Sequence, residues 1–405
     1  MAVLRVESIA AGGDGVGRLD GLAVFTPRTA PGELVEITVR QRGRMARGRL
    51  LNVIEPSPSR VVPRCRHYDG DRCGGCQLQH LTIEAQREAK QKIVQDAFSR
   101  IARRPIGVPD IVPSPQSWEY RSRLTLAMRW KGGKWIMGLH SFDDVNHVFD
   151  LQECPITDPR IVGAWTAIRA ASRHLPRTAE LRGTVRRSGD DLALIVEGGD
   201  TWHGAREFAR AVPELSVIRW RPSRGASRIV VDRRAGGAPE ESFDQVNQPV
   251  AMAARQELVD RALATSPRTA IDAYAGLGAT ARQLAAQGIS VTAIESDEAA
   301  AAYASSHLPP GSRVIAGSVE DAITAALPAD VVIVNPPRAG IDGRVASALD
   351  AAPTRLLYMS CDAATLARDV SRLPAYRVES IRAYDMFPQT AHVEVVCELR
   401  PSEGA

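Results

Sequence analysis

From about residue 255 the chain alternates apolar segments with alanine-rich ones, and this rhythm restricts the fold more than any other feature. The apolar segments RTAIDAYA, SVTAIES, DVVIVNPP and TRLLYMS have the length of strands, whereas GATARQLAAQG and DEAAAAYASSHL suit helices. Strands that alternate with helices form βαβ units, which build a mostly parallel sheet with helices on both faces. We therefore predict a doubly wound α/β domain over residues 251–405.

The N-terminal part has a different pattern, because short apolar runs alternate there with glycine-rich turns. This pattern predicts a small antiparallel, OB-like β-barrel over residues 1–57. Between two of its strands lies RQRGRMARGR, residues 40–49, with five arginines and no acid. A solvated turn and a nucleic-acid-binding edge are both compatible with that run. Residues 58–250 mix helical and strand patterns, which predicts a central α+β domain, with one helix over 82–101.

Composition is that of an ordinary globular protein. Of the 405 residues, 44% are hydrophobic and 24% are charged, and the net charge of +4 permits an anionic partner without requiring one. The N-terminus has no signal-peptide core, and no run approaches the roughly 18 apolar residues of a membrane span. We expect a cytoplasmic protein with no membrane partner, whose six cysteines do not form disulfides.

A glycine-rich turn in IDAYAGLGATARQLA, residues 271–285, indicates a nucleotide-type cofactor. Gly276 and Gly278 allow a tight turn between a strand and a helix. The next strand ends in Glu295, and an acid at that distance commonly binds ribose hydroxyls. Ala281 stands at the third position of the nicotinamide fingerprint, so these residues alone leave nicotinamide and methyl-donor cofactors open.

Polar or reactive residues also follow two further predicted strands. Asn335 begins an N-P-P triplet after the strand DVVIV, which suggests a methyltransferase that acts on a planar nitrogenous ring. Arg338 follows the prolines where adenine-amino methyltransferases favour an aromatic residue, and so points away from that class. Cys361 follows the strand LLYMS and precedes a helix, a position that can lower a thiol pKa. A small core cysteine is the alternative interpretation.

Six motifs together resemble those of the RNA uracil-C5 methyltransferases: CGGCQLQH, SFDQVNQP, DAYAGLG, NPPRAG, YMSCDAATLARD and FPQTAHVEVV. The resemblance runs in order from residue 1 to about residue 400. It implies that the N-terminal barrel is a TRAM domain, a small RNA-binding module, and that the C-terminal part is a class I S-adenosylmethionine-dependent methyltransferase fold. It also implies structured RNA, ribosomal or transfer, as the partner of a protein that we expect to be a monomer.

The resemblance also assigns roles to single residues. Cys361, in SCD, is the expected nucleophile, and Glu394, in HVE, is the expected general base. The expected cofactor-binding residues are Gln245, Tyr274, Glu295 and Asn335. Asn335 stands where the family usually has aspartate, so that an acceptor is kept and a charge is lost.

The expected reaction explains why these residue types are needed. Uracil C5 is a poor nucleophile, but a thiolate that adds to C6 creates an enolate whose negative charge extends to C5. C5 can then accept a methyl group, a base removes the C5 proton, and elimination expels the thiol. The ring must also leave its stack in the RNA.

Residues 64–80, RCRHYDGDRCGGCQLQH, hold three of the six cysteines, and such clusters in a reducing compartment often bind metal. The resemblance implies a [4Fe-4S] cluster on four thiolates, which are Cys65, Cys73, Cys76 and Cys154. Seven residues separate Cys65 from Cys73, where the family usually has five. Zinc on the same thiolates is the chemical alternative.

The leading hypothesis is an S-adenosylmethionine-dependent enzyme that forms 5-methyluridine in RNA. We favour 23S ribosomal RNA as its substrate, because family members with both a TRAM domain and a cluster often act there. A transfer-RNA T-loop uridine is the alternative. An inactive RNA-binding homologue is a competing class, against which the pair of Cys361 and Glu394 argues. A radical S-adenosylmethionine enzyme is another, against which the missing C-x3-C-x2-C motif argues.

Overall fold

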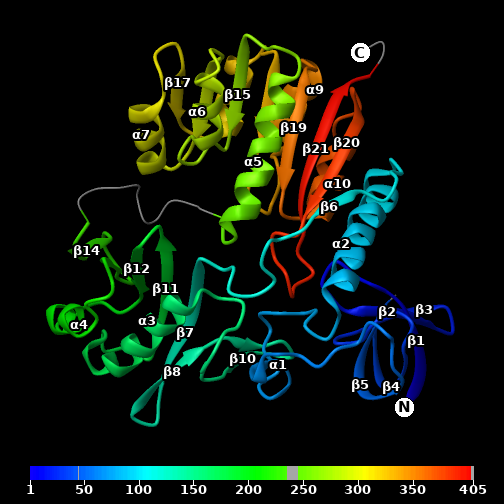
Figure 1. The fold of residues 1–405 in the computed structure, drawn as a ribbon, viewed down its shortest axis with the longest axis vertical. Coiled ribbons are helices and arrows are strands. Elements are labelled where there is room, and N and C mark those ends of the chain that lie inside the picture. The colour runs from blue at the N-terminus through cyan, green and yellow to red at the C-terminus, as the bar shows by residue number, and fades with distance from the viewer. Residues whose placement is uncertain (44, 235–244, 403–405) are drawn as a thin grey trace.

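The computed structural model describes residues 1–43, 45–234 and 245–402, and Figure 1 shows three parts that follow one another along the chain. A β-barrel comes first, a central sheet flanked by helices follows, and a layered α/β part lies at the opposite end of the molecule. Within the described residues no helix is both long enough and apolar enough to cross a membrane.

The N-terminal barrel closes from five strands in the order β1-β2-β3-β5-β4. Side chains alternate between the two faces of a strand, and the inward ones, among them Leu4, Val6, Val35 and Ile37, form a small core. The predicted barrel is therefore present, but it is not wholly antiparallel, because β3 and β5 pair in parallel. Its strands are β1 (Ala2–Ile9), β2 (Gly15–Leu19), β3 (Leu22–Thr26), β4 (Leu34–Arg42) and β5 (Met45–Glu55).

We expected the arginine run 40–49 to lie between two strands, but the structure places it differently. Most of it lies within β4 and β5, whose register pairs Arg40 with Arg47. The run therefore forms the end of a β-hairpin, on which Arg40, Arg47 and Arg49 are exposed. Arg47 pairs with Asp14 at 3.4 Å. Residue 44 lies outside the described residues.

The helix predicted over 82–101 is confirmed as α2 (Ile83–Ala97), which continues into a π-helical turn at Phe98–Ala102. Thr82 caps its first turn, where the hydroxyl accepts a backbone N–H at 3.3 Å. Val94 and its apolar neighbours pack into the core of the C-terminal part. The helix thus joins the cysteine-rich segment, which contains α1 (Arg66–Asp69), to the far end of the molecule.

Six strands form the central sheet in the order β14-β13-β12-β11-β7-β8. One face packs against α3 and α4 around Leu126, Val185, Leu194 and Trp220. A separate short pair is β9 (His140–Ser141) with β10 (Asp144–Val148). The elements are β7 (Arg123–Lys131), β8 (Lys134–Gly138), α3 (Pro159–Ala170), β11 (Glu180–Ser188), β12 (Asp191–Glu197), α4 (Ala205–Ala211), β13 (Val217–Arg221) and β14 (Arg228–Asp232).

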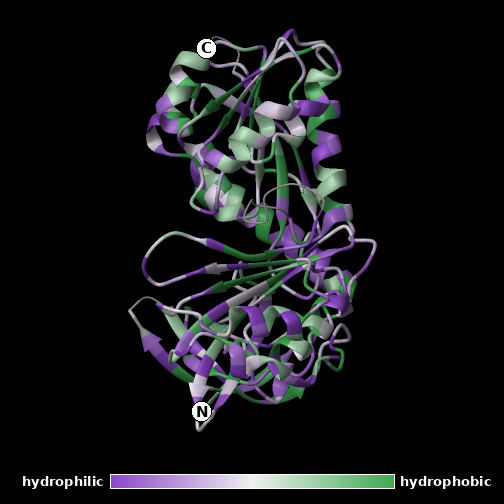
Figure 2. Cartoon of the chain, turned by 90° about the vertical axis from the view of Figure 1, so that its left-hand side faces the viewer, coloured by the Kyte–Doolittle hydropathy of each residue, from purple (hydrophilic) through white to green (hydrophobic). Residues whose placement is uncertain are grey.

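Eight strands form the C-terminal sheet in the order β17-β16-β15-β18-β19-β21-β20-β6. Strands β15 to β19 are parallel and β21 is antiparallel to both of its neighbours, so the predicted mostly parallel sheet is confirmed. Figure 2 shows these apolar strands between layers of helices. The strands are β15 (Thr269–Ala273), β16 (Ser290–Glu295), β17 (Arg313–Ala316), β18 (Val331–Val334), β19 (Arg355–Ser360), β20 (Tyr376–Tyr384) and β21 (Glu394–Pro401). The helices are α5 (Gln248–Leu263), α6 (Ala279–Ala285), α7 (Glu298–His307), α8 (Val319–Ala326), α9 (Gly343–Ala351) and α10 (Ala363–Ser371).

Main-chain pairing joins the central region of the sequence to the C-terminal sheet. Strand β6 (Asp110–Val112) lies within 58–250 but pairs in parallel with β20 as the edge strand of that sheet. Helix α5 begins at Gln248, just ahead of residue 251. The two regions therefore share structure on both sides of the expected boundary.

Candidate active site and cysteine centre

Five of the predicted site residues stand in a row along one edge of the C-terminal sheet. Glu295 ends β16, Tyr274 follows β15, Asn335 follows β18 and Cys361 follows β19, all at the carboxyl ends of parallel strands. Glu394 begins β21, whose antiparallel direction brings its amino end to the same edge. Ligands of open α/β sheets bind outside the carboxyl ends of the strands, so this edge is the candidate active site.

Two carboxylates support the glycine turn after β15. Tyr274 opens the turn in the left-handed backbone region, with φ of 62°. The N–H of Gly276 donates to Glu295 Oε2 at 2.7 Å, and the N–H of Ala281 donates to Asp272 Oδ2 at 3.0 Å. Burial raises the pKa of Asp272 to about 7. The expected ribose-binding acid therefore lies directly against the turn that would approach the cofactor.

Cys361 and Glu394 occupy facing positions at the ends of neighbouring strands. Ser360 pairs with Val395 across β19 and β21, and the next step of this register sets Cys361 opposite Glu394. Glu394 is buried, with 1% of its surface exposed, and burial raises its pKa to about 8. Burial, and then the charge of Glu394, raise the pKa of the Cys361 thiol, while Arg338 lowers it through its charge and a hydrogen bond.

The sequence-based expectation of a lowered thiol pKa is therefore wrong for Cys361. The helix that follows, α10, has its own anionic cap, because Asp362 Oδ1 accepts the N–H of Thr365 at 2.8 Å. This carboxylate is positioned to offset the positive end of the helix dipole, and it too raises the thiol pKa. Burial is the largest of these influences, and it favours the thiol over the thiolate.

Gln245 does not belong to this row of strand ends, because it lies just ahead of α5. Its carbonyl accepts hydrogen bonds from Gln248 Nε2 at 2.8 Å and from Ser122 Oγ at 3.4 Å, which tie it to the segment just before β7. Asn247, close to it in sequence, donates to the carbonyl of Met386 at 3.2 Å. The segment around Gln245 thus reaches the loop that precedes Glu394.

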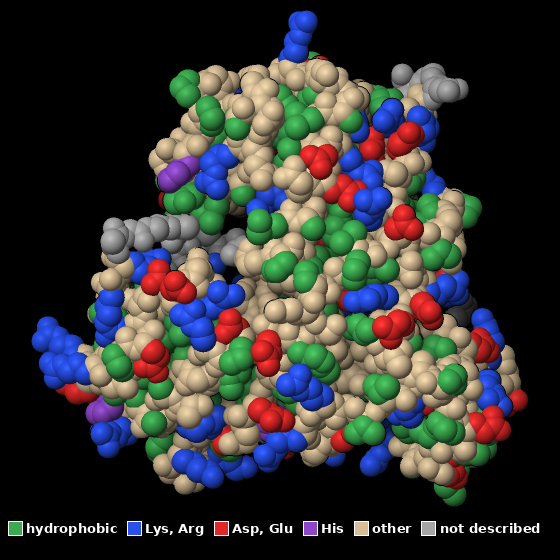
Figure 3. All heavy atoms as spheres, viewed as in Figure 1, with side chains coloured by type: hydrophobic (Ala, Val, Ile, Leu, Met, Phe, Trp, Pro, Cys, Tyr) green, Lys and Arg blue, Asp and Glu red, His purple; other side chains and the backbone are tan. Residues whose placement is uncertain are grey.

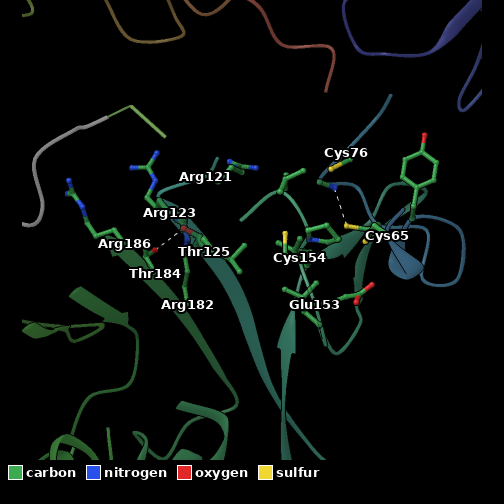
Figure 4. A pocket seen from close by; sticks show the side chains of 18 of the residues that line it. Cys65, Cys76, Arg121, Arg123, Thr125, Glu153, Cys154, Arg182, Thr184 and Arg186 are labelled. Atoms are coloured by element: carbon green, nitrogen blue, oxygen red, sulfur yellow. Dashed lines mark hydrogen bonds between the residues drawn. The ribbon is translucent and has the colours of Figure 1, made fainter. Parts of the chain in front are cut away.

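Four cysteines from two distant segments line one cavity of about 430 Å³ (Figure 4). Cys65, Cys73 and Cys76 are buried, Cys154 is partly buried, and all four are unpaired thiols. Burial raises the pKa of each thiol, that of Cys73 to about 11, and Cys154 adds to the increase at the other three. The structure therefore brings all four predicted ligands together.

Two of these sulfur atoms accept hydrogen bonds from the protein. The N–H of Gly75 donates to Cys73 Sγ at 3.4 Å, and the hydroxyl of Thr157 donates to Cys154 Sγ at 3.2 Å. Such bonds favour thiolates. Within the part of the chain that the structure describes, no three His, Cys, Asp or Glu side chains are placed to share a single metal ion.

The opposite wall of this cavity belongs to the central sheet and carries arginines. Figure 4 shows arginine side chains on β7 and β11 beside the cysteines. Two glutamates line the same cavity, and one of them, Glu197, pairs with Arg182 at 3.7 Å and Arg221 at 3.2 Å. Among the described residues that line the cavity, arginines outnumber glutamates; they are Arg121, Arg123, Arg182, Arg186 and Arg221.

Sequence reasoning missed this arginine wall. Its signal is arginine at even spacings in the strand-like segments RSRL and LRGTVRR and at the end of IRWR. Even spacing places side chains on one face of a strand, but only the sheet register shows that several strands contribute to one surface. Arg186 and Arg123, for example, are direct partners across β11 and β7.

The doubly wound sheet, with its glycine turn, the acid after the second strand and polar residues at the following strand ends, defines a class I S-adenosylmethionine-dependent methyltransferase fold. The same fold occurs in the Pyrococcus abyssi tRNA (uracil-54, C5)-methyltransferase, solved in complex with S-adenosyl-L-homocysteine. That structure matches with a TM-score of 0.73 and 23% identity, over 98% of this chain and 100% of its own.

Sequence comparisons identify the family. The tRNA (uracil-5-)-methyltransferase family model matches residues 320–400. An uncharacterized RNA methyltransferase of Gloeobacter violaceus is 32% identical over 98% of this chain and 96% of its own length. The 23S rRNA (uracil(1939)-C(5))-methyltransferase RlmD of Dechloromonas aromatica is 30% identical over 98% and 99%. The chain belongs to the RNA uracil-C5 methyltransferase family, and it is an S-adenosylmethionine-dependent RNA methyltransferase.

Proposed function

We propose that the protein forms 5-methyluridine with Cys361 as the nucleophile and Glu394 as the general base. The observation that carries this proposal is that Cys361, directly after β19, lies opposite Glu394 at the start of β21, at the edge that also holds Tyr274, Glu295 and Asn335. A nucleophile and a base that approach one ring from neighbouring strands are what addition and elimination at C6 and C5 require.

S-adenosylmethionine, when bound by the glycine turn with Tyr274, Glu295, Asn335 and Gln245, would supply an electrophilic methyl group. The sulfur of Cys361, once it has lost its proton, forms a bond to uracil C6, and the displaced electron pair becomes available at C5 for methylation. Glu394 then removes the C5 proton. The electrons of that C–H bond restore the C5–C6 double bond as the bond from C6 to sulfur breaks, which releases the thiolate.

The protonation states support Cys361 as the nucleophile and Glu394 as the base. Because its pKa is about 8, Glu394 is mostly protonated at neutral pH, and its base form is stronger than that of an ordinary carboxylate. Arg338 lowers the pKa of both Cys361 and Glu394. We infer that Arg338 favours the thiolate that attacks and the carboxylate that later accepts the proton.

The favoured substrate is 23S ribosomal RNA, in the cytoplasm. Relatives named for 23S rRNA uracil methylation are about 30% identical along nearly the whole chain, which supports this choice over a transfer-RNA T-loop uridine. The test is to map 5-methyluridine in total RNA from cells with and without the gene. Loss of one modified uridine from 23S RNA would support the proposal. Loss from the T-loop alone, or no loss, would overturn it.

Two arginine-rich surfaces support an RNA substrate. The first is the end of the β4–β5 hairpin in the barrel, which we propose acts as a TRAM domain, where Arg40, Arg47 and Arg49 are exposed. The second is the arginine wall of the cysteine cavity. Figure 3 also shows Lys and Arg side chains gathered along the lower left of the molecule, around the place where Figure 1 labels α3, α4 and β8. Arginine on an open surface matches the phosphates of RNA.

The cysteine centre fits an iron–sulfur cluster. The four thiols converge on one cavity although no three are placed around a single ion, and each thiolate of a four-iron cluster binds a different iron. We propose that Cys65, Cys73, Cys76 and Cys154 bind a [4Fe-4S] cluster in a structural role, because methyl transfer needs no electron. A zinc ion would require all four sulfur atoms to surround it, each at a Zn–S distance of about 2.3 Å.

A further inference from the structure

The loop of residues 385–393 runs from β20 to β21 and ends at Glu394. Four successive backbone carbonyls in this loop each accept a hydrogen bond from a different part of the chain. The bonds are Asn247 Nδ2 to Met386 at 3.2 Å, Lys90 Nζ to Phe387 at 2.9 Å, Tyr120 Oη to Pro388 at 2.9 Å, and Leu78 N to Gln389 at 3.0 Å. We call these four donors the loop clamp.

Helix α2 adds side-chain bonds to the same loop. Gln86 Nε2 donates to Gln389 Oε1 at 3.0 Å, while Gln86 Oε1 accepts the N–H of Gln389 at 2.8 Å. Lys90 also pairs with Asp385 at 2.5 Å, and both side chains are fully buried. A buried ion pair is costly to break from one side. The start and the middle of the loop are therefore fixed to α2.

The cysteine centre contacts the loop from another side. Leu78, whose N–H is one of the four clamp donors, follows Cys76 closely in the chain. Tyr120 shares a buried cluster with Cys65 and Cys76, and Phe387 of the loop packs against that cluster. A shift of the cysteine segment would therefore reach the loop through both a hydrogen bond and packing.

We propose that the loop clamp is a positioning device for the second half of the reaction, and that the cysteine centre is one of its supports. The proposal rests on the proposed role of Glu394 as the base. Clamp bonds end on the loop that leads into Glu394, whereas Cys361 stands between β19 and α10, outside the loop. A loosened clamp should therefore slow proton removal from C5 while addition of Cys361 and methyl transfer continue.

The sharpest variant is Tyr120→Phe, which removes one hydroxyl bonded to Pro388 and keeps the packing. The matched control is Tyr376→Phe. Tyr376 is also buried and also donates to a backbone carbonyl, that of Leu349 at 3.1 Å, but at the opposite end of β20. Single-turnover reactions with 23S RNA and S-adenosylmethionine would measure the methylated RNA that remains covalently attached to protein and the methylated RNA that is released.

For Tyr120→Phe we expect release to slow by roughly 10-fold to 100-fold, the scale of a small misplacement of a catalytic group, with methylated adduct accumulating. Gln86→Ala should behave in the same way, and Tyr376→Phe should release product at the wild-type rate. Equal slowing of methyl transfer and release in Tyr120→Phe, or adduct accumulation in Tyr376→Phe, would overturn the positioning role.

The support from the cysteine centre has a readout that does not depend on activity. Amide hydrogen exchange in residues 385–393 should be faster in protein stripped of iron than in protein that contains it, and exchange in β15 should be unchanged. If the loop exchanges at the same rate with and without iron, the cysteine centre does not support the loop clamp. If Glu394→Gln releases product normally, the proposed base is wrong. If Glu394→Gln stalls but Tyr120→Phe does not, only the clamp proposal fails.

Discussion

Cys361 directly follows β19 and Glu394 begins the antiparallel strand β21, so that the register, continued one step beyond Ser360 and Val395, sets the two residues opposite each other. Burial raises the pKa of both side chains, and Arg338 lowers both. Burial thus favours a thiol at Cys361 and a largely protonated carboxyl group at Glu394. The proposed mechanism requires each to lose its proton at a different step, which makes the two steps experimentally separable.

We predict that Glu394→Gln stalls after methyl transfer. The amide keeps the shape of the side chain but cannot remove the C5 proton, so the bond between Cys361 and C6 cannot break. A denaturant-resistant protein–RNA complex that contains the transferred methyl group should accumulate only when S-adenosylmethionine is present. Cys361→Ala serves as the control, because it should form neither product nor adduct. Normal turnover by Glu394→Gln, or an adduct from Cys361→Ala, would falsify the assignment.

Release of product should increase with pH. The raised pKa of Glu394, about 8, means that the base form is scarce below that pH and dominant above it. Cys361 does not titrate in this step, because in the adduct its sulfur is bonded to C6 and carries no proton. In single-turnover reactions between about pH 6 and about pH 9 the release rate should rise and then level off above the pKa of the base. A rate that stays flat across this range would contradict a buried Glu394 as the base.

Gly340, in the NPPRAG motif, should tolerate no side chain. Its φ is 80°, and an added Cβ would lie 2.1 Å from Asp369 Oδ2, which accepts bonds from Tyr358 and from the N–H of Ile341. Gly340→Ala should therefore lower the free energy of unfolding by at least about 2 kcal/mol. Gly343→Ala is the matched control, with open space around the added carbon and a change of about 1 kcal/mol or less. Urea unfolding of the two variants measures the difference.

The row of candidate site residues could be predicted because it depends on local rules. Each of Tyr274, Glu295, Asn335 and Cys361 follows or ends a short apolar segment, and parallel strands present their carboxyl ends at one edge. The motifs then indicated which of these polar residues to propose for the site. The barrel could be predicted for a similar reason, since its strands alternate apolar and polar residues over short distances.

The remaining features depend on long-range contacts that no local pattern contains. Lys90 and Asp385 are 295 residues apart in the chain, and each alone resembles a solvated surface charge. The arginine wall needs the registers of β7, β11 and β13, and the thiol pKa of Cys361 depends on burial and on Glu394 from another strand. These contacts arise only when distant segments pack together.

Protein purified without oxygen should be brown and contain about four irons per chain, as a cluster on four thiolates requires. Cys76→Ala should lose most of the iron, because it removes one ligand of the proposed centre. Cys397→Ala is the control, since Cys397 is a buried residue of β21 that lies outside the cavity. Iron and zinc are measured together by elemental analysis. Stoichiometric zinc without iron, or full iron in Cys76→Ala, would contradict the proposed centre.

The arginine wall should contribute to RNA affinity through phosphate contacts. Arg182 and Arg186 lie on the same face of β11 and line the cysteine cavity, so the double change Arg182→Ala with Arg186→Ala removes two of its charges. For unpaired RNA, the salt dependence of binding, as a log–log slope, falls by about 0.7 for each phosphate that the protein no longer neutralises. Arg313→Ala, on the far edge strand β17, removes an exposed arginine outside both surfaces and should leave the slope unchanged. Binding of 23S RNA, titrated at several salt concentrations, would show a reduced slope in the first variant. An unchanged slope there would mean that these arginines compensate the charge of the cysteine centre and do not contact RNA.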